Sequence, residues 1–271
     1  MNHSERALAF PLAIFPGAGG GAPNLSAFTA SDADLSRLSM IRYPGWTRYL
    51  LADFSADALI RELASEVASR APSGPIGLIG VSLGGHFGYA VALQLQAMGR
   101  EVAGLCAVDS FMVTTAAATP GWGRRHFVRA LGYLRQGSFE RLSAFARLLF
   151  WRALMRLAGG RAPALLRRFQ NSSRLRAALA RYPTFELELS MRLLMREVAP
   201  WLAALDRDPP PLAIPCAFLR TGRNAGDDPK WRRRCPNVEI VEIPGDHETL
   251  FDPGNIEAFR EAFLSATRDW R

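Results

Sequence analysis

The feature that most constrains this chain is a short segment, Gly80-Val81-Ser82-Leu83-Gly84, which separates a strand-like apolar run from a helix-like run. The segment matches the pattern G-x-S-x-G in the context that the pattern requires, a tight turn from a strand into a helix. Glycine at positions 80 and 84 avoids side-chain collisions across such a turn, where the backbone is strained. We therefore predict that Ser82 is a nucleophile held at the tip of a buried strand.

Strand-like and helix-like runs alternate on both sides of this segment. Apolar β-forming runs predict strands, and apolar residues at helical spacing predict helices. Such an alternation produces βαβ units and a mostly parallel sheet with helices on both faces. Together with the serine turn it predicts the α/β-hydrolase fold. The expected strands cover 11–15, 39–42, 75–81, 102–108, 216–221 and 238–243, and the expected helices cover 55–70, 84–98 and 255–268.

The segment between the fourth and fifth expected strands breaks this rhythm, because it contains no convincing strand. A long helical stretch between two strands of one sheet is typical of an inserted cap or lid. We therefore expect an α/β core made of residues 1–112 and 206–271, with residues 113–205 inserted as a large helical lid. The helices expected within the insertion cover 139–157, 164–181 and 185–198.

The inserted segment also carries the excess positive charge of the chain, whose formal net charge is +8. Residues 111–205 contain 16 arginines and four acidic residues, a net charge of +12, so the remainder has a net charge of −4. A basic face attracts nucleic acid, anionic lipid or an acidic protein. A genome rich in G and C would explain arginine in place of lysine, but not its concentration in one segment.

The composition argues against several other classes of protein. No apolar run reaches the roughly 18 residues that span a bilayer. The basic segment shows no recognisable motif for reading nucleic acid. The three cysteines form no C-x-x-C pair, which argues against a disulfide framework or a zinc site. We expect a cytoplasmic protein with no metal and no nucleic-acid partner, and membrane association is not expected.

A serine nucleophile needs a base, and the sequence contains four histidines. His247 follows the last expected strand, so it would lie in a loop at the carboxyl end of the sheet, where an α/β-hydrolase keeps its base. His86 lies one helical turn beyond Ser82, where its ring would lie beside the nucleophile's own helix. His3 is close to the N-terminus, and His126 lies in the insertion. We predict His247 as the general base.

The imidazole of a catalytic histidine needs a carboxylate that orients it and stabilises its cation. Asp109 ends the strand that follows the serine's strand, and a carboxylate at the tip of a buried strand is costly without a partner. Asp227 and Asp228 follow the next strand, which is the commoner place for the acid in this fold. We favour Asp109 and keep Asp228 as the alternative acid. Asp246, beside the predicted base, is interpreted as structural.

The oxyanion that forms during acyl transfer needs backbone N–H donors. One donor is expected from Leu83, after the serine, and the other from the loop FPGAGG at residues 15–20. Small residues let this loop approach a substrate closely, and we predict Ala18 as the second donor. The loop does not match a phosphate-binding loop, because it lacks both the GK[ST] ending and the G-x-G-x-x-G pattern.

Four motifs in this order resemble those of the thioesterase domains of nonribosomal peptide and polyketide synthases. They are FPGAGG, GVSLGG, AVDSF and PGDHETL, with the aspartate of the third motif 27 residues beyond the serine. The resemblance covers residues 8–112 and 212–268, and in that family this aspartate is the acid, which supports Asp109. Stand-alone editing members usually read GHS at the serine turn and place the acid one strand later. Val81 replaces that histidine here, so the resemblance implies a releasing thioesterase.

The resemblance implies a reaction on a polyketide or peptide chain that a carrier protein holds as a thioester on its phosphopantetheine arm. Ser82 would take the acyl chain, and hydrolysis or cyclisation would release it. The arm belongs to the partner, so the enzyme needs no cofactor of its own. Carrier proteins of such systems are typically acidic, and we expect one to dock near the arginine-rich lid. The chain is expected to be a discrete protein.

Three other interpretations stay open at this point. One is a type II editing thioesterase of the same family. The second is an esterase or lipase whose arginine-rich helical cap engages anionic lipid. The third is a binding module that keeps the fold and grips an acyl carrier without catalysis. Labelling of the serine by a fluorophosphonate separates the third from the first two, because only a nucleophilic serine reacts.

Overall fold

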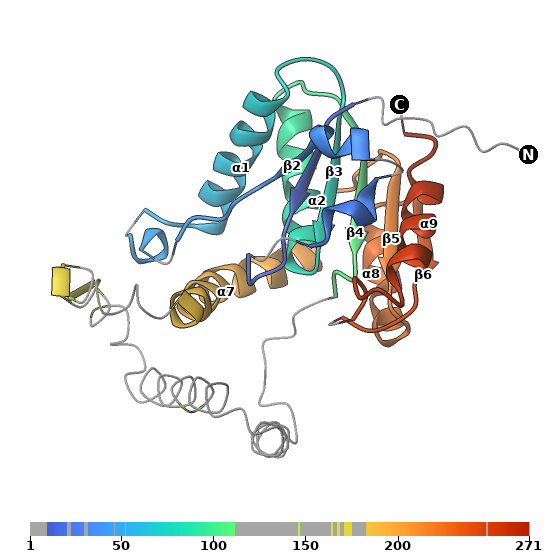
Figure 1. The fold of residues 1–271 in the computed structure, drawn as a ribbon. Coiled ribbons are helices and arrows are strands. Elements are labelled where there is room, and N and C mark those ends of the chain that lie inside the picture. The colour runs from blue at the N-terminus through green and yellow to red at the C-terminus, as the bar shows by residue number, and fades with distance from the viewer. Residues whose placement is uncertain are drawn as a thin grey trace, which may run out of the picture.

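The computed structural model describes residues 10–20, 23–29, 32–45, 47–51, 53–111, 146, 164, 167–168, 171–174, 183–247 and 249–270. Within these residues a six-stranded sheet runs in the order β2-β1-β3-β4-β5-β6, and every neighbouring pair is parallel (Figure 1). This sheet confirms the predicted α/β-hydrolase fold. The strands are β1 (Leu12–Phe15), β2 (Leu38–Met40), β3 (Ile76–Val81), β4 (Val102–Val108), β5 (Cys216–Arg220) and β6 (Val238–Glu242).

The side chains of the central strands alternate between two hydrophobic clusters, one on each face of the sheet. In β4, Leu105 and Ala107 belong to one cluster, and Cys106 and Val108 belong to the other. This alternation is the two-residue period of a strand. Every residue of β3 and β4 is buried, which explains why both strands appear in the sequence as continuous apolar runs.

Helices cover both faces of the sheet, as the alternating sequence pattern predicts (Figure 1). Helices α1, α2 and α8 contribute to one cluster, and α9 and η1 contribute to the other. The helices are α1 (Ala56–Arg70), α2 (Leu83–Ala97), α7 (Pro183–Arg207), α8 (Asp228–Arg234) and α9 (Ile256–Ala266), and the 3-10 helices are η1 (Leu25–Phe28), η2 (Asp32–Arg37), η3 (Arg48–Leu50) and η5 (Gly222–Asp227).

Most of the predicted lid, residues 113–205, lies outside the described residues. Of the helix expected over 139–157, the structure describes residue 146 alone, which is helical, so the lid stays a prediction. In the helix expected over 164–181, Asn171 and Ser172 are not helical, so that helix is interrupted there. Asparagine and serine favour such interruptions, because their side chains compete for backbone hydrogen bonds.

The helix that returns the chain to the core, α7, is longer than the predicted 185–198 and continues past Pro200. Proline removes one hydrogen bond of the helix. Leu202, beyond the proline, is buried in the same cluster as Leu194, so the helix keeps packing on the core. Packing of this kind supplies most of the stability of a helix in a protein. In the described part of the chain, no helix combines the length and the apolar composition that crossing a bilayer requires.

Candidate active site

The carboxyl ends of β3 and β4 bring two predicted site residues together. Ser82 follows β3 and Asp109 follows β4, and these neighbouring strands pair Val81 with Val108. The Ser82 N–H donates to the Val108 carbonyl at 2.8 Å, and the Asp109 N–H donates to the Leu219 carbonyl at 2.7 Å. Both residues therefore extend the hydrogen-bond ladder of the sheet, and they lie at its carboxyl edge, where ligands bind in parallel sheets of this kind.

Ser82 lies in the strained turn that its sequence context predicts. Its backbone angles, φ 55° and ψ −120°, fall outside the regions that residues other than glycine prefer. A Cβ atom on Gly80 would lie 2.2 Å from the Gly84 carbonyl oxygen, and one on Gly84 would lie 2.0 Å from the Phe15 carbonyl oxygen. The turn therefore has room only for glycine at both positions. Helix α2 begins at Leu83, so the partly positive end of this helix adjoins the serine.

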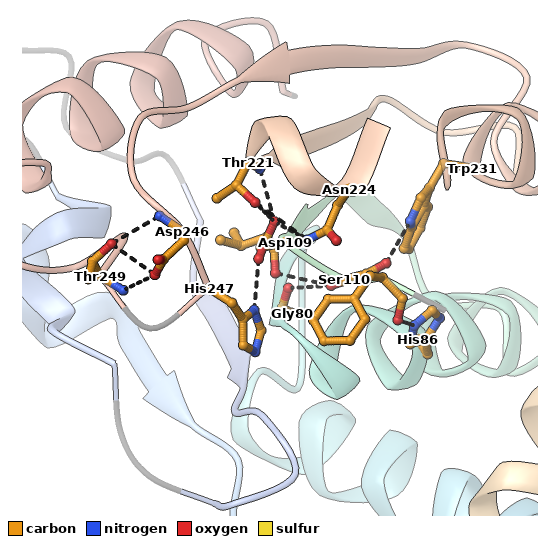
Figure 2. A network of polar contacts seen from close by, with 12 residues as sticks. Gly80, His86, Asp109, Ser110, Thr221, Asn224, Trp231, Asp246, His247 and Thr249 are labelled. Carbon is orange, nitrogen blue, oxygen red and sulfur yellow. Dashed lines mark hydrogen bonds and ion pairs between the residues drawn. The ribbon is translucent and has the colours of Figure 1, made fainter. Parts of the chain in front are cut away.

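Asp109 and His247 form a hydrogen-bonded pair at this edge (Figure 2). His247 Nδ1 lies 2.7 Å from Asp109 Oδ2; the Asp109 side chain is 0% exposed, and the His247 side chain is 40% exposed. The other carboxylate oxygen, Oδ1, accepts hydrogen bonds from the Thr221 N–H at 2.9 Å, the Thr221 hydroxyl at 2.9 Å and the Asn224 amide at 2.6 Å. The carboxylate is therefore held at both oxygens.

These contacts set the charge of Asp109. Burial raises the pKa of this carboxyl, but hydrogen bonds from His247, Thr221 and Asn224 stabilise the ionised form, and together they lower the pKa below its ordinary value. An ionised carboxylate only accepts hydrogen bonds, so Nδ1 of His247 carries a proton. In the neutral imidazole, Nε2 then has a lone pair that can accept a proton.

Two of the other carboxylates considered from the sequence have structural contacts. Asp228, the alternative acid, begins helix α8 and accepts a hydrogen bond from the Arg220 Nε at 2.8 Å. Asp246 Oδ1 accepts from the Thr249 N–H at 3.2 Å and from the Thr249 hydroxyl at 3.0 Å (Figure 2). The hydrogen bonds between Asp246 and Thr249 close the loop that carries His247.

His86, the other histidine near the nucleophile, is fully buried in α2. Burial and the nearby cation of Arg234 lower the pKa of His86 to about 3, so this imidazole is neutral at physiological pH. Both of its ring nitrogens contact protein groups. A buried, neutral ring that is bonded on both sides is unsuited to accept the proton of Ser82.

The glycine-rich loop after β1 passes beside Ser82. A Cβ atom on Gly17 would lie 3.4 Å from the Ser82 Cβ and 3.9 Å from the Ser82 Oγ. The loop closes in a turn in which the Gly20 N–H donates to the Gly17 carbonyl at 2.9 Å, and Ala18 lies within that turn. The structure therefore brings the loop that holds the predicted donor Ala18 to the predicted nucleophile.

Four residues of the site were not found from the sequence. Thr221 and Asn224 hold the carboxylate of Asp109, the Tyr43 hydroxyl donates to a carbonyl of the glycine-rich loop at 2.7 Å, and the Phe111 ring packs against the predicted base. Thr221 had a usable signal, because it follows β5 at the same edge of the sheet. The other three depend on how loops fold back, which spacing in the sequence does not show.

A parallel sheet of this topology, a serine at a strand-to-helix turn and a buried aspartate bonded to a loop histidine define the class of the protein as an α/β-hydrolase. The family model for the thioesterase domain matches residues 10–266, so the chain belongs to the thioesterase domain family. The match confirms the resemblance that the four motifs indicate. No curated protein sequence matches the chain.

Solved structures of the same fold include thioesterase domains. The NocB thioesterase domain, in covalent complex with a fluorophosphonate nocardicin G analogue, has 21% identity and a TM-score of 0.55 over 96% of this chain and 95% of that one. The Vlm2 thioesterase domain, bound with a dodecadepsipeptide, has 20% identity and a TM-score of 0.54 over 97% and 95%. A four-domain nonribosomal peptide synthetase has 20% identity and a TM-score of 0.54 over 96% of this chain and 19% of its own.

Proposed function

We propose that this chain is a serine thioesterase whose catalytic residues are Ser82, His247 and Asp109. The observation that carries the proposal is the 2.7 Å hydrogen bond between the buried Asp109 carboxylate and His247 Nδ1, at the sheet edge where the strained turn holds Ser82. Such a bond fixes the tautomer in which Nε2 accepts a proton, as general-base activation of a serine requires. Membership of the thioesterase domain family supports the same chemistry.

In the proposed reaction, the Ser82 oxygen attacks the carbonyl carbon of a thioester while its proton passes to Nε2 of His247. The tetrahedral intermediate carries negative charge on the former carbonyl oxygen, which the N–H groups of Leu83 and Ala18 stabilise. Collapse of the intermediate breaks the C–S bond, and the imidazolium returns the proton to the departing sulfur. Water, or a hydroxyl or amine within the acyl chain, then attacks the acyl-serine with His247 again as base.

We propose that the thioester is carried on the phosphopantetheine arm of a carrier protein. The similarity in fold to NocB, to Vlm2 and to a four-domain nonribosomal peptide synthetase supports this substrate class. The arm supplies the sulfur, so the proposed chemistry requires neither a cofactor nor a metal of the enzyme's own. The carrier is proposed to be acidic and to dock near the arginine-rich segment 113–205, in which Arg167 and Arg168 are exposed.

Labelling by a fluorophosphonate, followed by peptide mass spectrometry, tests the nucleophile. We expect the label on Ser82 in the unaltered chain and no label in Ser82→Ala. The matched control is Ser69→Ala, which removes an exposed hydroxyl from α1 and should be labelled like the unaltered chain. A folded, unaltered chain that stays unlabelled would instead identify a binding module without catalysis.

Release of product from three forms of one acyl chain tests the substrate class. The chain is supplied as a carrier-protein thioester, as a small soluble thioester and in a lipid emulsion. We expect the highest kcat/KM for the carrier thioester. A preference for the emulsion would identify a lipid hydrolase. In a second comparison, with acyl groups of different length on the same carrier, a preference for short groups over long ones would identify an editing thioesterase.

A further inference from the structure

A second histidine, His86, lies in the same region as the proposed triad but takes no part in the reaction described above. It is on α2, one helical turn beyond the nucleophile, and its side chain is completely buried. Its Nε2 lies 3.1 Å from the Phe111 carbonyl oxygen, and its Nδ1 lies 2.6 Å from Nη1 of Arg234. A buried side chain bonded at both ends has a fixed orientation.

The contact with Arg234 decides which ring nitrogen carries the proton. A guanidinium group only donates hydrogen bonds, so Nδ1 of His86 accepts and the proton lies on Nε2. The Nε2–H therefore donates to the carbonyl oxygen of Phe111. Because His86 is neutral, this arrangement persists throughout the pH range in which the enzyme would work.

Arg234 is itself held rigidly at the end of α8. Its side chain is 0% exposed and forms an ion pair with Asp206, which lies in the last turn of α7. Its guanidinium lies 5.1 Å from the ring centroid of Tyr89 and 5.4 Å from that of Trp231, so it makes cation–π contacts with two rings. Trp231 also stacks on His86 with ring centroids 5.8 Å apart. Arg234 is therefore held as firmly as His86, its hydrogen-bond partner.

The same network holds the backbone that follows the catalytic aspartate. The Phe111 N–H donates to the Asp109 carbonyl at 3.1 Å, the Trp231 indole N–H donates to the Ser110 carbonyl at 3.0 Å, and His86 holds the Phe111 carbonyl. The carbonyls of three consecutive residues are thus all bonded. This fixes the place from which the Phe111 side chain leaves the backbone.

The Phe111 side chain reaches the proposed base. Its ring packs edge to face with the His247 imidazole, with centroids 4.8 Å apart and planes at 78°. His247 is on a loop, its side chain is 40% exposed, and its bond to Asp109 acts at one atom of the ring. One hydrogen bond leaves the ring able to tilt about that contact, and a second contact from an aromatic ring limits the tilt.

We propose that His86 is a positioning residue for the base His247 and that it acts through Phe111. The inference rests on the proposed function, because a position for the imidazole matters only if His247 takes the proton of Ser82. Buried Arg234 sets the tautomer of His86, His86 fixes Phe111, and the Phe111 ring fixes the plane of the imidazole.

The rate at which a fluorophosphonate labels Ser82, measured per folded molecule, tests the last link of this chain. Phe111→Leu removes the ring and keeps the backbone carbonyl, and we expect labelling to slow about tenfold, within the range that a misplaced catalytic group produces. Phe111→Tyr keeps the ring and should recover most of the rate. The matched control is Phe263→Leu, which removes a buried ring from α9 on the other face of the sheet and should not change the rate.

A double-mutant cycle tests the link from His86 to Phe111. His86→Leu removes both polar contacts and should slow labelling, whereas His86→Gln offers an acceptor to Arg234 and a donor to the Phe111 carbonyl and should be close to the unaltered chain. Adding His86→Leu to Phe111→Leu should cause no further loss, because both changes interrupt one route. If His86→Leu does not fold, His86→Gln still tests the histidine, and an unchanged labelling rate in Phe111→Leu still overturns the proposal.

The outcomes separate this inference from the proposed function. If Phe111→Leu is labelled as fast as the unaltered chain, or if the two losses multiply in the double variant, His86 does not position the base, and the triad is unaffected. A loss of thermal stability with an unchanged labelling rate would overturn the inference too, since the network would then support only the fold. An unaltered chain that is folded and unlabelled would overturn the proposed function, and this inference with it.

Discussion

Ser82 and Asp109 are the residues other than glycine in the described part of the chain that have positive φ, at 55° and 44°. Each directly follows a buried strand, and the two strands are neighbours in the sheet. A backbone of this kind costs on the order of 1–3 kcal/mol per residue and persists only where the surroundings hold it. At Ser82, closely packed glycines hold the backbone. At Asp109, hydrogen bonds to both carboxylate oxygens hold it. The fold therefore accepts strain at two of the three residues that we place in the reaction.

Asp109→Asn should reduce kcat about 10⁴-fold, because an amide no longer selects the tautomer in which Nε2 of His247 accepts the proton. The test is the steady-state kcat of the unaltered chain and of Asp109→Asn, measured with the same thioester. Asp228→Asn is the matched control, and its kcat should stay close to that of the unaltered chain, since Asp228 is bonded to Arg220. A larger loss in Asp228→Asn than in Asp109→Asn would make Asp228 the acid.

The lowered pKa of Asp109 also predicts how stability depends on pH. The folded pKa lies below the ordinary value, so the unfolded chain binds the proton first as the pH falls. The stability that the ionised carboxylate contributes is therefore fully present above about pH 5 and is lost as the pH falls through about 4 and below. Urea unfolding at several pH values from 3 to 5, where free histidine is already protonated, measures this for the unaltered chain and Asp109→Asn.

In this comparison the free energy of unfolding should fall more steeply with decreasing pH in the unaltered chain than in Asp109→Asn, so that the two values converge at the acid end. Parallel curves would show that Asp109 has the same pKa in the folded and unfolded chains. That result would contradict the carboxylate contacts as the cause of the shift.

At the scale of elements, the turn from β3 into α2 is packed directly against β1. Gly84→Ala would place a Cβ atom 2.0 Å from the Phe15 carbonyl oxygen, which belongs to the backbone and cannot move alone. We expect a loss of at least about 3 kcal/mol in the free energy of unfolding, the upper part of the range for overpacked cores. Urea unfolding measures it. Gly254→Ala, where no atom lies within 4 Å of the new Cβ, is the control and should leave stability nearly unchanged.

The elements that could be predicted from the sequence are those whose pattern is local. Buried strands such as β3 and β4 are continuous apolar runs, and Ser55 before α1 is a recognisable cap, which accepts from the Ala58 N–H at 3.1 Å. Helix α8 could not be predicted, because it has seven residues and begins with Asp228-Pro229, a pair that also starts turns.

In the candidate site, too, the residues that could be predicted are those with a local signal in the sequence. Ser82, Asp109 and His247 each follow a strand, so the topology of a parallel sheet is enough to place them at the same edge, where Asp109 and His247 are hydrogen-bonded. The choice between Asp109 and Asp228 stayed open in the sequence, because both follow strands that end at one edge. The pair of His86 with Arg234 joins residues 148 positions apart, and nothing in either local sequence indicates it.

At the scale of the whole molecule, charge is unevenly divided along the chain. Residues 111–205 have a net charge of +12 and the remainder has −4, so an acidic protein is attracted to one part of the molecule and repelled by the rest. A field of this kind mainly accelerates encounter and orients the partner. A small neutral thioester would not respond to this field. Comparing it with a carrier-protein thioester therefore measures the effect of charge on docking.

The kcat/KM for a carrier-protein thioester should therefore fall about tenfold as ionic strength rises from about 0.05 M to about 0.5 M, whereas that for a small neutral thioester should stay constant. Reversing two exposed charges of the insertion, in Arg167→Glu/Arg168→Glu, should lower the carrier value and weaken its dependence on salt. Arg61→Glu/Arg268→Glu makes the same change in charge on the core and is the matched control. Equal losses in the two double variants would show that net charge alone attracts the carrier, and a salt-independent kcat/KM would show that docking does not depend on the arginines.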